Sequence, residues 1–159
     1  MIDLNKMFKP ESVAVIGASN TPGKVGYIIV DNLINDGFEG EIYPVNPKGG
    51  EILGKTAYAN IKDVPGKVDL VIITIPSPFV NTAVKECGEV GIENMVVITA
   101  GFKEVGEEGA KLEAELTALG KEYGINIIGP NSLGITDSHT PLNGSFSQMM
   151  PPKGNMAFI

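Results

Sequence analysis

The segment Ser12 to Gly26, SVAVIGASNTPGKVG, constrains the fold of this chain more than any other. It opens with small and β-branched apolar residues, which are typical of a buried parallel strand. A glycine-rich turn follows, and residues with helical periodicity come after the turn. Gly17, Gly23 and Gly26 permit a sharp turn and a close approach of a ligand to the backbone, and the start of the next helix offers unpaired N–H groups with partial positive charge. The segment predicts a strand–turn–helix unit that holds a phosphate.

Apolar segments and helical stripes alternate along the rest of the chain. Ser77 and Pro78 are expected as the N-cap and first-turn proline of one of the helices. Strands are predicted at residues 13–16, 41–45, 69–75, 94–99 and 125–128, with helical stripes at 25–33, 80–87 and 112–123 and at most a short helix near 57–63. This β-α-β alternation implies an α/β, Rossmann-like, doubly wound and mainly parallel sheet with helices on both faces.

Each unusual loop comes directly after a predicted strand. The carboxyl ends of parallel strands meet at one edge of a sheet, so these loops should gather on one rim, where ligands of such sheets bind. The loops are GASNTPGKVG at 17–26, NPKGG at 46–50, PSP at 76–78, AGFKE at 100–104 and GPNSLG at 129–134.

Length, charge and cysteine content exclude several classes of protein. With 159 residues, 43% of them hydrophobic, the chain can bury one good core, and its net charge of −7 argues against a nucleic-acid or anionic-membrane binder. No window is long and apolar enough to span a bilayer, and Asp3, Lys6 and Lys9 interrupt the segment where a signal peptide would need apolar residues. The single cysteine, Cys87, is expected in the core. It supports no disulfide and no metal cluster, so a cytoplasmic protein without a metal site is predicted.

The residues around the glycine turn narrow the choice of phosphate ligand. A common NAD site has G-x-G-x-x-G and an acid after the second strand, whereas this chain has G-x-x-x-x-x-G-x-x-G and Lys48 in that region. A lysine there favours a ribose that carries its own phosphate, as in NADP or coenzyme A. A Mg-nucleotide P-loop is disfavoured because Val25 replaces the Ser or Thr that would hold the metal.

Six motifs in register resemble those of a known family. They are FKP before SVAVIGAS, GKVG, YPVNPKGGEILG, DLVIITIPSPFV, ITAGFKEVG and GPNSLG. Together they resemble the N-terminal CoA-binding domain of ADP-forming acyl-CoA (acetyl-CoA) synthetases, relatives of the succinyl-CoA synthetase α subunit. The resemblance covers almost the whole chain. It implies a ligase that interconverts acyl-CoA, ADP and phosphate with acid, CoA and ATP.

The resemblance also implies which residues contact coenzyme A. The glycine loop would cradle the CoA phosphates, the segment at Lys48 would contact the adenosine 3′-phosphate end, and the turn at 75–77 would line the CoA channel. The loop at 100–102 would lie near the thiol, although Ala100 replaces a glutamate of the succinyl relatives. The candidate contacts are Gly17, Ala18, Ser19, Gly23, Lys24, Val25, Gly26, Val45, Asn46, Pro47, Lys48, Ile75, Pro76, Ser77, Ala100, Gly101, Phe102 and Asn131.

The resemblance predicts a binding domain without its own catalytic residue. Residues 1–150 would form the CoA-binding domain, and 151–159 would begin the next domain, with the segment at 154–159 as its first strand. The family's phosphorylated histidine lies in that next domain, so His139 is expected to be an exposed loop residue. The implied partners are CoA or acyl-CoA, the phosphohistidine domain and an ATP-grasp domain or subunit. Self-association of the isolated chain is also expected, because a lost partner domain would expose apolar surface.

Two other functions remain open from the sequence. One is a stand-alone sensor that binds CoA or NAD(P). The other is the CoA-binding region of a fused protein acetyltransferase, which would share the same motifs.

Overall fold

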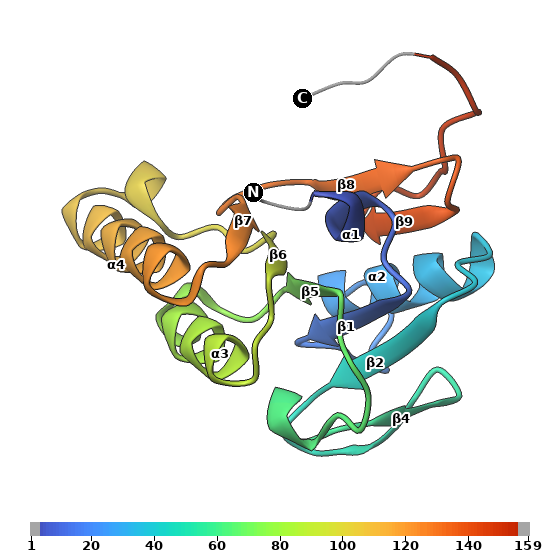
Figure 1. The fold of residues 1–159 in the computed structure, drawn as a ribbon, viewed down its shortest axis with the longest axis horizontal. Coiled ribbons are helices and arrows are strands. Elements are labelled where there is room, and N and C mark those ends of the chain that lie inside the picture. Colours follow the sequence, from blue (N-terminus) through green and yellow to red (C-terminus); the bar gives the residue numbers. More distant parts are fainter. Residues whose placement is uncertain (1–3, 156–159) are drawn as a thin grey trace.

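A five-stranded parallel sheet forms the centre of the molecule (Figure 1). The structure is a computed structural model and describes residues 4–155. The strand order is β2-β1-β5-β6-β7. These strands are β1 (Ser12–Ile16), β2 (Glu41–Val45), β5 (Leu70–Ile73), β6 (Asn94–Val97) and β7 (Asn126–Ile128). The doubly wound α/β architecture predicted from the sequence is confirmed.

Both faces of this sheet are covered (Figure 1). The helices α3 and α4 lie on one side, and α2 lies on the other with a two-stranded antiparallel hairpin, β8–β9. The helices are α1 (Asn5–Phe8), α2 (Val25–Asn35), α3 (Ser77–Glu89) and α4 (Glu107–Tyr123), with 3-10 turns η1 (Ile61–Asp63) and η2 (Lys103–Val105). The hairpin strands are β8 (Gly134–Asp137) and β9 (Leu142–Ser145).

Strand β1 shows why the sheet needs cover on both faces. All five of its residues are buried; Val13 and Val15 pack in the core under α2, whereas Ala14 and Ile16 pack in the core under α3 and α4. Side chains alternate along a strand, so an unbroken apolar strand has an apolar residue for each face. Each large apolar side chain buried in this way contributes about 1.5–3 kcal/mol.

Most of the predicted elements are confirmed, with one error at a helix start. The five sheet strands agree with the predicted ranges to within two residues, and α4 ends at Gly124, whose φ of 69° is left-handed. Ser77 is not the N-cap of α3, however. Pro76 occupies that position without a side-chain cap, and Ser77 is the first helical residue.

Two short hairpins were not predicted. One is β8–β9, and the other is formed by β3 (Gly50–Ile52) and β4 (Lys55–Ala57) beside the edge strand β2. These strands have only three or four residues each and contain glycine and polar residues, so they carry too little apolar periodicity to be recognised. Of the strand predicted at 154–159, residues 156–159 lie outside the described part, and 151–155 form no helix or strand. Across residues 4–155, no helix combines the length and apolarity that crossing a membrane requires.

Candidate functional site

The winding of the sheet reverses between β1 and β5. From β1 the chain passes through α2 to β2 on one side, whereas β5, β6 and β7 follow one another on the other side. The loops at 17–26 and 74–77 therefore flank the switch point at the carboxyl ends of neighbouring strands. This is where open α/β sheets bind their ligands.

The two loops at the switch point touch each other. A Cβ at Gly17, whose φ is +96°, would lie 2.5 Å from the Thr74 hydroxyl oxygen. The N–H and the hydroxyl of Thr74 both donate to the carbonyl oxygen of Ile16, at 2.9 and 3.1 Å. Only glycine fits here, so the turn after β1 is held directly against the turn after β5.

The first turn of α2 presents free backbone donors. Lys24 is its N-cap and makes no side-chain cap, and the N–H groups of Tyr27 and Ile28 already donate to the Lys24 carbonyl at 3.0 Å each. Within residues 4–155 the N–H groups of Val25 and Gly26 have no hydrogen-bond acceptor, and the first turn holds no acidic residue. An anion can accept these donors and gains from the helix dipole.

The loop at 17–26 and the N–H groups of Val25 and Gly26 form what we call the phosphate cradle, and two further glycines shape it. A Cβ at Gly26 would lie 2.0 Å from the carbonyl oxygen of Gly17, so α2 begins in direct contact with the end of β1. Gly23 has a φ of +84°, is exposed, and has open space where its Cβ would be. Gly26 is thus required for close packing, and Gly23 for the turn of the exposed part of the loop.

Two exposed lysines flank the cradle. Lys24 lies in the loop itself, and Lys48 follows β2; neither makes an ion pair within the described residues. Asn46 connects the two segments, because its side-chain N–H donates to the Ala18 carbonyl at 2.8 Å and its oxygen accepts the Lys48 N–H at 2.9 Å. The neighbouring Val45 is buried, so its side chain faces the core.

Asn20 makes a second connection that the sequence did not indicate. Its side-chain N–H donates to the Glu51 carbonyl at 2.7 Å, and its oxygen accepts the Leu53 N–H at 3.0 Å. Both partners belong to the β3–β4 hairpin. Because this hairpin was not predicted, an asparagine in a glycine-rich turn gave no signal beyond the turn itself.

The loops after β5 and β6 are also joined. The Thr99 hydroxyl donates to the carbonyl of Ile75 at 2.7 Å, and a Cβ at Gly101 would lie 2.6 Å from the Ser77 hydroxyl oxygen. The predicted segments 75–77 and 100–102 therefore lie side by side on the rim, next to the switch point.

The carboxylate of Glu104 binds the backbone of the loop after β6. Its carboxylate accepts the N–H of Gly101 at 2.6 Å and that of Phe102 at 3.2 Å. These backbone hydrogen bonds, above all the one from Gly101, lower the pKa of Glu104. The Phe102 side chain is fully buried in the core, so only its backbone belongs to the rim, whereas Ala100 is exposed.

Asn131 lies on the same rim but further from the switch point. It follows β7, is exposed, and has a left-handed φ of 55°. Its N–H donates to the Thr99 carbonyl at 2.9 Å, which ties the GPN turn to the loop after β6.

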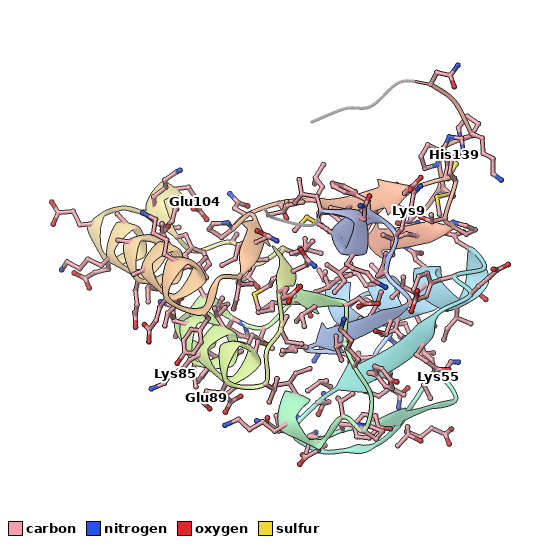
Figure 2. All side chains as sticks on the ribbon, viewed as in Figure 1. Lys9, Lys55, Lys85, Glu89, Glu104 and His139 are labelled. Atoms are coloured by element: carbon pink, nitrogen blue, oxygen red, sulfur yellow. The ribbon has the colours of Figure 1, made fainter. Side chains whose placement is uncertain are left out.

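The only histidine and the only cysteine lie elsewhere. His139 is exposed in the turn between β8 and β9, far from Glu104 in Figure 2, and its Nε2 lies 3.1 Å from the Gly154 carbonyl. Cys87 packs in the core on α3, and burial raises the pKa of its thiol to about 12. The described residues contain no cluster of His, Cys, Asp and Glu that could hold a metal ion. None of these features adds reactive chemistry to the rim.

Two concavities lie away from the glycine loop. A groove of about 440 Å³ between α4 and β7 reaches Gly129 and Pro130, and a hollow of about 200 Å³ lies between η1 and residues 90–92. Neither is lined by the loop at 17–26. We place the candidate site at the switch point because the α2 donors without partners among residues 4–155 lie there, and because Asn46 joins the segment of Lys48 to the glycine loop.

Comparison with known proteins links this geometry to one family. A family model described as a CoA binding domain matches residues 11–138. The chain is 48% identical over 156 residues to acetate–CoA ligase [ADP-forming] I of Archaeoglobus fulgidus, a match that covers 98% of this chain and 22% of that protein. It is 47% identical over 156 residues to the α subunit of acetate–CoA ligase [ADP-forming] II of Pyrococcus furiosus, covering 98% of this chain and 34% of the subunit.

Solved structures agree with these matches. The acetyl-coenzyme A synthetase 1 of Ca. Korarchaeum cryptofilum, described as dinucleotide forming and solved with phosphate and ADP, has a TM-score of 0.88 and 42% identity, covering 92% of this chain and 31% of that one. PH0766 of Pyrococcus horikoshii has a TM-score of 0.86 and 47% identity, covering 90% and 33%. The chain thus spans between about a fifth and a third of these relatives.

Proposed function

The chain belongs to the family of CoA-binding domains, and on that premise we propose that its rim binds coenzyme A as part of an ADP-forming acyl-CoA synthetase. One observation carries the proposal: the uncapped start of α2 faces the switch point, and among the described residues neither its first N–H groups nor the two nearby lysines have a partner. Coenzyme A carries a diphosphate and a separate 3′-phosphate. It therefore offers one anionic group to the N–H groups of α2 and another to a lysine.

Each part of the rim has a role in this proposal. The N–H groups of Val25 and Gly26 bind the diphosphate, and Lys48 binds the 3′-phosphate. The 75–77 turn guides the pantetheine arm toward the loop at 100–102, where the thiol would react. Glu104 holds that loop in place. Its lowered pKa keeps it ionised and makes it a weak proton acceptor, so we assign it no role as a general base.

The activity of the whole enzyme is also a proposal. The relatives that are named as ADP-forming acetate–CoA ligases are about three to five times as long as this chain, because the chain covers 22–35% of their length. We therefore propose that a phosphohistidine domain and an ATP-grasp domain or subunit complete the reaction, in the cytoplasm. The described residues supply the binding of CoA. The relatives named above favour neither the sensor nor the acetyltransferase alternative. Self-association of the isolated chain remains a prediction for sedimentation analysis.

Titration calorimetry with the purified chain tests the CoA site. Coenzyme A should bind more tightly than 3′-dephospho-CoA by roughly ten- to a hundredfold, the value of one charge-assisted contact. Lys48→Ala should abolish this difference. Lys85→Ala is the matched control. Lys85 is an exposed lysine on α3, and it lies far from Lys55 of the β3–β4 hairpin in Figure 2.

A thermal-shift panel separates coenzyme A from the other nucleotides. CoA should raise the melting temperature more than dephospho-CoA, NAD, NADP or ADP at equal concentration, since a ligand stabilises the folded state according to its affinity. Stabilisation by NAD or NADP without stabilisation by CoA would replace the proposal with a nucleotide sensor. Equal affinity for CoA and dephospho-CoA would remove Lys48 from the site.

A further inference from the structure

Two asparagines tie the glycine loop to the segment that follows β2. Asn46 joins Ala18 to Lys48, and Asn20 joins the tip of the loop to Glu51 and Leu53 in the β3–β4 hairpin. Each asparagine uses both its side-chain nitrogen and its side-chain oxygen, at distances of 2.7–3.0 Å. We name these four hydrogen bonds the asparagine latch.

The glycine loop has little else to hold its outer part in place. Residues 20–24 are all exposed, and Gly23 has open space around it. A loop with few buried apolar contacts and a permissive glycine samples many conformations unless polar contacts fix it. Asn20 supplies such contacts at the tip of the loop, and Asn46 at its base.

The segment at Lys48 is held by the same latch. The Asn46 side chain fixes the Lys48 N–H, and the Asn46 backbone is fixed in turn, since its N–H donates to the Tyr58 carbonyl at 2.9 Å. The Gly17 N–H also donates to the Val45 carbonyl at 3.0 Å, where β1 and β2 pair, so the latch extends an existing backbone connection outward to the tip of the glycine loop and to Lys48.

We propose that Asn20 and Asn46 are positioning residues that fix the spacing between the α2 phosphate cradle and Lys48, and thereby select a ligand whose diphosphate and third phosphate have the spacing found in coenzyme A. The inference rests on the proposed function, in which these two elements hold the two phosphate groups. A ligand that must reach two sites gains from the second one only if the sites are held at the right distance beforehand. A ligand that lacks the third phosphate gains nothing from this spacing.

This role differs from direct contact with the ligand. The side-chain nitrogen and oxygen of Asn46 and of Asn20 each make one hydrogen bond within the protein. The latch should therefore act on the difference in affinity between CoA and dephospho-CoA. An asparagine that simply touched the diphosphate would contribute equally to both ligands.

Calorimetry on Asn20→Ala, Asn46→Ala and the double variant tests the proposal. The ratio of CoA affinity to dephospho-CoA affinity should fall by about tenfold in the double variant, and by less in each single variant, as the fixed spacing is lost. Asn35→Ala is the matched control: Asn35 is exposed at the far end of α2, and its side chain donates to Asp31. An equal loss of affinity for both ligands, or an unchanged ratio, would overturn the selective role.

Hydrogen exchange on the chain without ligand tests the latch independently of CoA. The non-proline amides at 18–24 and 48–53 should exchange fastest in the double variant, and faster than in the wild type in each single variant, because their order depends on the asparagines. They should remain unchanged in the control. Unchanged exchange would overturn the positioning role even if the chain binds CoA. A wild-type chain that binds CoA and dephospho-CoA equally would remove Lys48 from the site and refute the selectivity, whereas a chain that binds neither ligand would refute the proposed function. In both cases the exchange data would still report on the latch. If Asn46→Ala does not fold, Asn20→Ala still tests the proposal. Asn20 is exposed, so its replacement should leave the fold intact.

Discussion

Replacing Gly26 with alanine should separate α2 from the end of β1. The added Cβ would lie 2.0 Å from the Gly17 carbonyl oxygen and 2.8 Å from its carbonyl carbon. Real Cβ atoms essentially never come closer than 3.0 Å, so the helix start must move by about 1.0 Å (3.0 minus 2.0). Both contacts are backbone atoms at the end of a fully buried strand, so no side chain can rotate away.

The magnitude follows from two opposing terms. Overpacking costs about 1–3 kcal/mol, and a clash with backbone atoms that cannot rotate away belongs to the upper part of this range, about 2–3 kcal/mol. Alanine recovers about 1 kcal/mol of helix propensity. A net loss of about 1–2 kcal/mol lowers the melting temperature by roughly 2–8 °C in a chain of this size. A displacement of about 1 Å also lengthens the N–H contacts with the diphosphate, so CoA affinity should fall by at least about tenfold.

Gly120→Ala is the matched control for this experiment. Gly120 is also helical, but a Cβ there would lie 3.0 Å from the flexible end of the Ile127 side chain, which can move by a few tenths of an ångström. Its stability should stay the same or rise by up to about 1 kcal/mol, with unchanged CoA binding. Thermal melts and CoA titrations of both variants are compared. A Gly26→Ala chain with the stability and CoA affinity of the wild type would refute the close-packing argument.

Three further predictions concern groups outside the phosphate cradle. Cys87 should resist iodoacetamide at pH 8 in the native chain and react after denaturation, because burial raises its pKa to about 12; mass spectrometry that finds native labelling would contradict this. Phe102→Ala should cost about 3–5 kcal/mol in urea unfolding, since it removes a fully buried ring, and a smaller loss would mean that the core closes over the cavity. The pKa of Glu104 is lowered in the folded chain, so its contribution to stability is complete above the pKa of a free glutamate, near 4.3, and is lost as pH falls through the lower folded value. Glu104→Gln should therefore be less stable than the wild type at pH 7, and the deficit should shrink toward pH 3; a deficit independent of pH would exclude the charge as its cause.

The central sheet could be predicted from the sequence because the patterns that indicate its strands and helices involve only residues that are near neighbours in the chain. Unbroken runs of β-branched residues, such as the one that forms β1, are recognisable without knowing their neighbours, and so are glycines after helices, such as Gly124. The order of these elements placed every unusual loop on one rim, which includes Gly17 and Lys48. The family resemblance added the ligand, and the family match and the relatives support it.

The contacts between loops could not be predicted from local patterns, because the residues that meet there are far apart in the sequence. Asn20 meets Glu51 and Leu53 across more than 30 residues, through a hairpin whose three-residue strands have no clear pattern of their own. The predicted site residue Phe102 has its side chain in the core, since the loop after β6 turns it beneath α4.

The sequence alone thus determined the layers of this protein, the rim on which its loops meet and the glycine turn that can approach a phosphate. Only the tertiary structure decided which loops touch, that Gly26 is packed against Gly17, and that two asparagines join the glycine loop to the segment that follows β2. The physical reason is range: apolar periodicity and turn chemistry act between near neighbours in the chain, whereas side-chain amides find their partners only after the sheet has brought separate loops together.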